Sequence, residues 1–265
     1  MILSSGLAVP WGVAALVAYA AAAIAAGTRW SPLALLAGWL AHGVLLALDV
    51  FGGAEGVMRF GFAPVLSLTV WLVLAVHAVE SRFVPLPGVR RALALAGAVV
   101  VVLVAIFPGE VRSHGGSPWL PVHWLLGVAS YGLFGAAVLH AMMLDAAERR
   151  MRPGAVPLDA ERTGPLGLPL LKLERLTFRF VEAGFVVLSA ALLFGLWSTV
   201  QWRWDHKNVL SLLGWATFAA LLLGRHLYGW RGRRATRWLY GGAALLALAY
   251  VGSRFVLEVL LRRTA

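Results

Sequence analysis

The feature that most constrains this chain is a series of apolar segments, each about as long as a membrane is thick. A helix that crosses about 30 Å of hydrocarbon needs roughly 20 mostly apolar residues. Eight segments meet this requirement, and we expect a spanning helix in each of them: 7–27, 32–51, 62–80, 91–107, 121–144, 176–197, 208–228 and 235–259. The sequence therefore predicts an all-α polytopic membrane protein, a bundle of about eight transmembrane helices that forms one domain over residues 1–265.

The composition agrees with a chain that is surrounded by lipid. Apolar residues make up 60% of the sequence and charged residues only 13%, whereas ordinary globular domains are about 25% charged. A soluble fold of this size needs more charge to cover its surface, so that class is excluded. The chain contains no cysteine, which excludes disulfides, iron–sulfur clusters and thioether attachment of haem to this chain.

The positive charge of the chain indicates its orientation in the membrane. The net charge of +11 could suggest a nucleic-acid partner, but the basic residues form short clusters between apolar segments, so we expect no nucleic acid. Most of them lie in or beside four loops: 28–31, 81–90, 145–175 and 229–234. Because Lys and Arg concentrate in cytoplasmic loops, we expect 145–175 to be a cytoplasmic loop and both termini to lie on the outer, periplasmic side.

A tryptophan-rich segment separates the sixth and seventh apolar segments, on the predicted outer face. It holds three indoles with an acid and two bases close by: Trp197, Trp202, Arg203, Trp204, Asp205 and Lys207. One interpretation is an aromatic belt, because Trp prefers the membrane interface. The other is a platform for a flat apolar ring that carries carboxylates. Haem has this chemistry, since its faces stack on indoles and its propionates bind cations.

This segment resembles the WWD signature of the cytochrome c assembly family, the haem-handling membrane proteins of the CcsA, CcmC and HemX type. The resemblance covers residues 121–260, and it is greatest to the short, eight-span, HemX-like proteins of the bacterial inner (plasma) membrane. It implies non-covalent haem b as the cofactor, held at the outer face by the tryptophan segment. It also implies that His123, at the start of the fifth apolar segment, is an axial ligand of the haem iron.

Two histidines are candidate iron ligands, and they lie at different depths. His123 is level with the tryptophan segment, whereas His42 lies about 14 Å below the outer end of its segment at ~1.5 Å per residue. We therefore expect two separate levels for haem iron. Each residue has an alternative role: His42 as a hydrogen-bonded packing residue, and His123 as a cap of its helix. Three further histidines, near the inner ends of their segments, could contribute to a deeper site: His77, His140 and His226.

Two charged residues near the outer face have similarly open roles. Arg254 lies within the last apolar segment, where it could bind a haem propionate through a charge-assisted hydrogen bond. Its alternative is an ion pair with Glu258, one helical turn away. Asp205 could contribute to the haem site, or it could stabilise the N-terminus of the helix that follows it.

The preferred function is a haem-binding membrane protein that presents haem at the outer face. Its expected partners are haem, membrane lipid and other cytochrome c assembly proteins or an apocytochrome, and we expect no independent catalytic activity. One alternative is a HemX-like regulatory or accessory protein that affects tetrapyrrole synthesis without delivering haem. Another is a small-solute transporter with His42 and Asp49 on a polar path.

Overall fold

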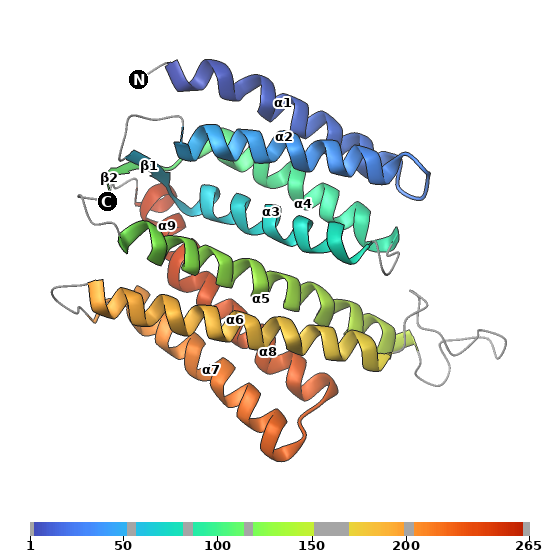
Figure 1. The fold of residues 1–265 in the computed structure, drawn as a ribbon, viewed down its shortest axis with the longest axis vertical. Helices are drawn as coiled ribbons and strands as arrows, with labels where there is room; N and C mark the ends of the chain where they lie inside the picture. The colour runs from blue at the N-terminus through green and yellow to red at the C-terminus, as the bar shows by residue number, and fades with distance from the viewer. Residues whose placement is uncertain are drawn as a thin grey trace. The chain divides into compact units, whose positions relative to one another are not determined.

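The computed structural model describes residues 3–51, 57–81, 87–113, 119–150, 170–198 and 204–261. Its long helices, shown in Figure 1, are α1 (Leu3–Ile24), α2 (Ser31–Phe51), α3 (Phe62–Glu80), α4 (Pro87–Ile106), α5 (Trp119–Arg150), α6 (Leu170–Ser198), α7 (His206–Tyr228) and α8 (Gly232–Ala247). After α8 the chain continues through the π-helix η1 (Leu248–Gly252), α9 (Ser253–Phe255) and the π-helix η2 (Val256–Leu260).

Helix occupies most of each of the eight predicted segments, which confirms the all-α polytopic fold. Among the described residues, seven helices are long and apolar enough to cross a membrane, and α1 adds a shorter apolar stretch, Ala8–Ile24. Outside the helices, β1 (Val57–Phe60) pairs antiparallel with β2 (Glu110–Ser113), with Val57 opposite Ser113. The sequence did not predict this pair, because four-residue strands are too short to show an alternating pattern.

The described residues group into two compact units. The first unit contains Met1–Val122 and Tyr250–Ala265, and the second contains His123–Ala249. In the first unit α1 packs against α2 and α4, α3 packs against α2 and α4, and β1 adjoins α2 and α3 (Figure 1). In the second unit α7 packs between α6 and α8. The region 121–260 that carries the family resemblance contains the whole second unit.

The helices of the first unit approach closely around a buried tyrosine. The Tyr19 side chain is fully buried, and two glycines lie against its ring. A β-carbon on Gly38 of α2 would lie 2.6 Å from Tyr19 Cδ1, and one on Gly97 of α4 would lie 2.8 Å from Tyr19 Cε2. Small residues at such places let helix backbones come together in lipid, where van der Waals contact drives association.

A pair of tryptophans joins α2 to α3 in the same unit. The rings of Trp39 and Trp71 stack with centroids 4.8 Å apart and an interplanar angle of 7°. The Trp39 indole N–H donates to the Trp71 carbonyl at 3.1 Å, and the Trp71 indole N–H donates to the Trp39 carbonyl at 3.0 Å. Each polar end of the pair is thereby satisfied without water.

Aromatic packing between small residues also forms the core of the second unit. Phe134 of α5 and Phe218 of α7 stack with ring centroids 3.9 Å apart. β-Carbons on Gly184 and Gly242 would lie 3.0 Å from Phe134 and 2.9 Å from Phe218, respectively. The Tyr131 hydroxyl donates to the Leu246 carbonyl, so α5 is also bonded to the backbone of α8 just before the first π-helix.

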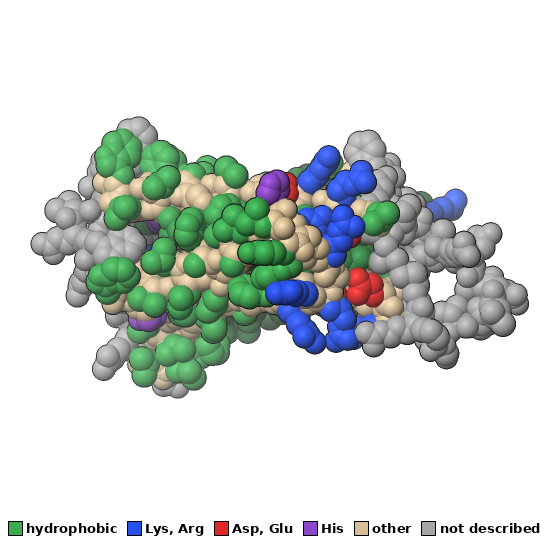
Figure 2. All heavy atoms as spheres, turned by 90° about the horizontal axis from the view of Figure 1, so that it is seen from below, with side chains coloured by type: hydrophobic (Ala, Val, Ile, Leu, Met, Phe, Trp, Pro, Cys, Tyr) green, Lys and Arg blue, Asp and Glu red, His purple; other side chains and the backbone are tan. Residues whose placement is uncertain are grey.

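The exposed surface is largely apolar, as expected for a surface that faces lipid. Large apolar side chains such as Val17, Leu193 and Leu223 are more than half exposed, at 62%, 67% and 58%. Figure 2 shows a face that is largely covered by hydrophobic side chains, with Lys and Arg gathered toward one end. Exposed arginines include Arg231, just before α8, and Arg233 and Arg234 in the first turn of α8.

The contact between Tyr19 and Gly38 predicts a destabilising substitution. Gly38→Ala is expected to lower the free energy of unfolding by about 1–3 kcal/mol, the usual cost of overpacking a tight core. The measurement is thermal unfolding of the purified protein in detergent, followed by tryptophan fluorescence. Gly12→Ala is the matched control, because its β-carbon would make only an ordinary contact, 3.9 Å from Leu45. Equal midpoints for the two variants would contradict the prediction.

Candidate functional site

In the part of the chain that the structure describes, the imidazole of His123 is held by a hydrogen bond through one of its two nitrogens. His123 lies in the first turns of α5, and its Nδ1 is 2.8 Å from the backbone oxygen of Ala191 in α6. A carbonyl oxygen only accepts hydrogen bonds, so Nδ1 must carry the proton. The Nε2 of the neutral ring then keeps its lone pair. Metal-binding histidines have this arrangement, in which the non-ligating N–H donates to a carbonyl or carboxylate.

Three helix ends of the second unit come together around this ring. A β-carbon on Gly195 of α6 would lie 2.9 Å from His123 Cε1, so the missing side chain makes room for the imidazole. Lys207, in the first turn of α7, is close enough for its charge to act on His123. About one turn further along α5, a β-carbon on Gly127 would meet no described atom within 4 Å apart from the neighbouring backbone of its own helix. His123 therefore lies near a lysine, and the helix face one turn away from it is open.

The described tryptophans of the predicted platform border the same end of the unit. Trp197 in the last turn of α6 is 71% exposed, and Trp204 just before α7 is 72% exposed. The ring centroids of Trp197 and Phe194 are 6.0 Å apart. Trp202 and Arg203 lie outside the described residues. The structure thus brings His123 to the end of the second unit at which Trp197 and Trp204 are exposed.

Asp205 has the geometry of a helix cap. Its backbone is extended, with φ −87° and ψ 163°, and its carboxylate accepts a hydrogen bond from the Asn208 amide at 2.8 Å. This is the expected alternative role, stabilisation of the N-terminus of α7. The side chain is exposed, and the cap also fixes the direction in which the chain enters α7 beside Lys207.

His42 lies in the first unit, in different surroundings. It is fully buried in α2, with Nδ1 3.1 Å from the Tyr19 hydroxyl and Nε2 2.7 Å from the Ser67 hydroxyl. Both ring nitrogens are engaged, as the packing alternative requires. Iron ligation by His42 would require one of these two hydrogen bonds to break.

Arg254, also in the first unit, pairs with a residue far away in the sequence. Its guanidinium lies 3.5 Å from a carboxylate oxygen of Glu110 in β2 and 6.0 Å from the ring centroid of Tyr250. Elsewhere in the first unit, Asp49 and Arg59 line an apolar crevice of about 370 Å³ between α1, α2 and α4. Arg254 is thus paired with Glu110, and the charge of Arg59 acts on Asp49.

The remaining histidines lie in varied surroundings. His77 and His140 are buried, with His140 Nδ1 2.7 Å from the Ala136 carbonyl in its own helix, while His226 is exposed at the end of α7. Within the described ranges, no group of three or more His, Asp or Glu side chains forms a metal cluster. A haem iron needs only axial protein ligands, because the porphyrin supplies the others.

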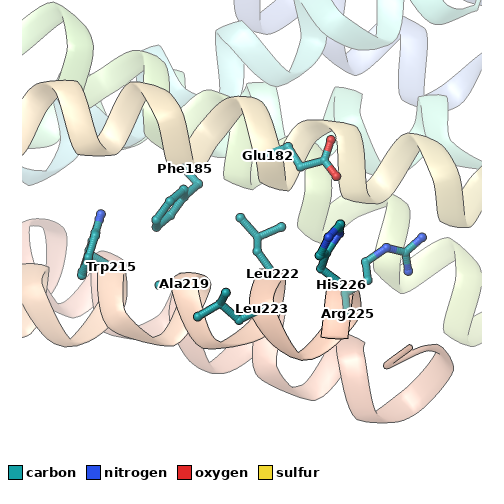
Figure 3. A pocket seen from close by; sticks show the side chains of 8 residues that line it. All are labelled: Glu182, Phe185, Trp215, Ala219, Leu222, Leu223, Arg225 and His226. Atoms are coloured by element: carbon teal, nitrogen blue, oxygen red, sulfur yellow. The ribbon is translucent and has the colours of Figure 1, made fainter. Parts of the chain in front are cut away.

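Sequence reasoning missed a groove between α6 and α7. Figure 3 shows the side chains that line this space of about 650 Å³: Glu182, Phe185, Trp215, Ala219, Leu222, Leu223, Arg225 and His226. A signal was present, because residues 215, 219, 222 and 226 recur at helical spacing on one face of α7. The sequence did not reveal that α6 leaves this face uncovered.

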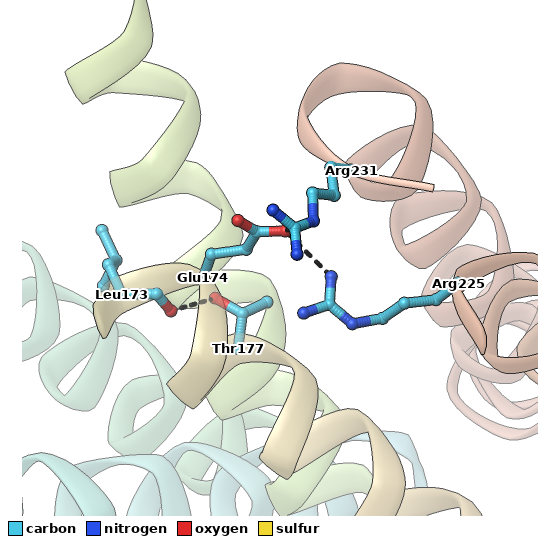
Figure 4. A network of polar contacts seen from close by, with 5 residues as sticks. All are labelled: Leu173, Glu174, Thr177, Arg225 and Arg231. Atoms are coloured by element: carbon cyan, nitrogen blue, oxygen red, sulfur yellow. Dashed lines mark hydrogen bonds and ion pairs between the residues drawn. The ribbon is translucent and has the colours of Figure 1, made fainter. Parts of the chain in front are cut away.

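An ion-pair network fixes the helix ends beside this groove. Arg225 binds the Glu174 carboxylate at 2.9 Å, and Arg231 approaches the same carboxylate at 4.0 Å (Figure 4). The Arg225 guanidinium also lies 3.7 Å from the ring centroid of Phe178. From the sequence, Glu174 falls in the predicted loop 145–175 and Arg231 in the predicted loop 229–234, but the sequence could not give their pairing.

The fold and the site define a class of protein: a polytopic membrane protein with a histidine and exposed tryptophans at one end of a helical unit. The sequence profile of the family described as Cytochrome C assembly protein matches residues 30–261. The chain therefore belongs to the cytochrome c assembly protein family.

Individual relatives agree with this assignment. The Inner membrane protein YpjD of Escherichia coli (strain K12) is 27% identical over 241 residues, 87% of this chain and 89% of that protein. The Cytochrome c biogenesis protein CcsA of Synechococcus sp. (strain RCC307) is 28% identical over 163 residues, 51% of each chain. The protein of the same name from a strain of Prochlorococcus marinus is 21% identical over 217 residues, 70% of this chain and 69% of that protein. No solved structure matches the chain.

The relatives and the helices together give the location. A relative along most of the chain is named an inner membrane protein, and seven described helices have the length and composition to cross a membrane. The chain is thus a multi-pass inner-membrane protein.

The cap geometry of Asp205 predicts how two substitutions differ. Asp205→Ala removes the acceptor for the Asn208 amide and is expected to cost about 1 kcal/mol of stability, whereas Asp205→Asn retains a capping oxygen and costs little. Thermal unfolding in detergent measures both variants against the wild type. Equal loss in the two variants would show that the negative charge, rather than the cap, is what stabilises this helix end.

Proposed function

We propose that this protein binds haem b non-covalently at the outer face of the membrane, with His123 Nε2 as an axial ligand of the iron. The observation that carries the proposal is the hydrogen bond from His123 Nδ1 to the Ala191 carbonyl. It holds the ring in one tautomer and orientation, which is what an iron ligand needs. The orientation of the chain, with both termini outside, belongs to the proposal and is supported by the distribution of Lys and Arg.

The other residues at this end supply the contacts that a porphyrin requires. Trp197 and Trp204 expose apolar faces on which the ring can stack. Lys207 can donate to a propionate, and the open space near Gly127 leaves room beside the imidazole. Asp205 positions Lys207 through the cap rather than by touching haem.

The biological role we propose is presentation of haem to other cytochrome c assembly proteins or to an apocytochrome. Two of the relatives described above are named for cytochrome c biogenesis, and the chain spans about half the length of the Synechococcus one. Bound haem supplies the iron chemistry, while the protein contributes orientation and exclusion of water. No covalent step on this chain is required, since it has no cysteine.

The direct test is a haemin titration of the detergent-purified protein, followed by the Soret band. His123→Gly is expected to weaken haemin binding by more than about tenfold, because even loss of a group that orients a ligand costs 10–100-fold. Added imidazole is expected to restore the band, which separates loss of the ligand from loss of the fold. His226→Ala, at the opposite end of α7, is the matched control and is expected to bind haemin normally.

Two outcomes would overturn this proposal. One is a wild-type protein that stays colourless with haemin. The other is a His123→Gly variant that binds haemin as the wild type does. In cells, deletion is expected to lower c-type cytochromes; altered haem-precursor levels with normal cytochromes would instead support the HemX-like regulatory role.

The proposed contact between Lys207 and a propionate predicts a charge-dependent effect. Lys207→Glu is expected to weaken haemin binding by about two- to fivefold, the range for one exposed ion pair. Binding of the dimethyl ester of haem, which carries no carboxylates, should change little. Parallel titrations with the two porphyrins measure the difference, and an equal loss for both would show that Lys207 acts on the fold of the site rather than on a propionate.

A further inference from the structure

The groove between α6 and α7 has the length of one membrane leaflet. Its lining on α7 extends from Trp215 to His226, which corresponds to about 16 Å along a helix at ~1.5 Å per residue. Half of the hydrocarbon core is about 15 Å thick. His226 stands at the end of α7 and Trp215 near its middle, so the groove extends from the membrane surface to about the midplane.

The deeper part of the groove is apolar and preformed. The rings of Phe185 and Trp215 stack with centroids 5.5 Å apart and an interplanar angle of 25°. The Trp215 indole N–H donates to the Ser189 hydroxyl at 2.8 Å, so its polar atom is already satisfied. With Leu222 and Leu223, these rings present an apolar surface suited to an extended hydrocarbon chain.

The shallow end of the groove carries both signs of charge. Glu182 is exposed, and in the described parts of the chain its carboxylate has no ion pair or hydrogen bond. Arg225 is held by Glu174 at 2.9 Å with 24% of its side chain still exposed, and His226 is exposed beside it. Figure 3 shows Glu182, Arg225 and His226 together at one end, with Phe185 and Trp215 toward the other.

We propose that this groove is a binding site for a phospholipid of the phosphatidylethanolamine class. Glu182 lies within the apolar span Leu173–Trp197. A carboxylate there is costly without a partner, and a primary ammonium can donate to it. The headgroup phosphate accepts from Arg225 and His226, and one acyl chain lies along Phe185 and Trp215. A choline headgroup has no N–H to donate, and an anionic glycerol headgroup has no cation for Glu182, so the site discriminates between lipid classes.

The proposal does not rest on haem binding, because the charged end of the groove lies at Arg225 and His226, near the C-terminal end of α7, whereas His123 bonds to Ala191 in the C-terminal part of α6. Its test is native mass spectrometry of the delipidated protein with phosphatidylethanolamine, phosphatidylcholine and phosphatidylglycerol of matched acyl chains. The wild type is expected to retain phosphatidylethanolamine about tenfold more strongly than phosphatidylcholine, as for a hydrogen bond between charged groups. Glu182→Gln should remove most of this preference.

Two further variants make the test specific. Glu148→Gln, on α5 outside the groove lining, is the matched control and is expected to keep the preference. Leu222→Trp fills the groove and should lower retention of all three lipids while the protein remains monodisperse. The proposal would be overturned if the wild type retained ethanolamine and choline lipids equally or preferred phosphatidylglycerol. It would also be overturned if Glu182→Gln kept the preference, or if haemin displaced the bound lipid.

Discussion

Hydrocarbon offers no hydrogen bonds, and this one constraint determines most of what the chain does with its polar atoms. It requires helices, because only they satisfy the backbone within each crossing segment. It also requires partners for the polar side chains between them. Trp39 and Trp71 bond to each other's carbonyls, and Asp145 accepts from the Tyr240 and Thr236 hydroxyls at 2.9 and 3.0 Å. These hydrogen bonds between polar groups therefore hold helices together.

Against that background, the two candidate iron ligands differ in a way that suggests different roles. His42 engages both nitrogens with Tyr19 and Ser67 in the interior of the first unit, so it joins three helices. His123 engages one nitrogen with Ala191, at an end of the second unit that exposes tryptophans. A histidine with one anchored nitrogen is preorganised to bind something else, and it loses little conformational entropy when it does so.

The sequence alone predicted the helices, because the thickness of the membrane sets the length of each apolar segment. It also suggested the role of Asp205, since an aspartate just before a helix is a common cap. It could not give contacts between residues far apart in the chain. Arg254 was expected to meet a propionate or Glu258, yet its guanidinium lies beside Glu110, 144 residues earlier. The groove between α6 and α7 likewise depends on how the two helices pack, which the sequence does not give.

The position of α7 connects the two ends of the second unit. On one side α7 is packed tightly against α8, where a β-carbon on Gly214 would lie 2.8 Å from Leu246. On the side that faces α6, bulky rings at Phe185 and Trp215 leave a groove instead of a close contact. Helices are stiff over these lengths. The distance between α6 and α7 along the groove therefore influences the distance between Trp197, in the last turn of α6, and Trp204, just before α7. The spacing of these two exposed tryptophans therefore depends on how α6 and α7 pack farther along their length.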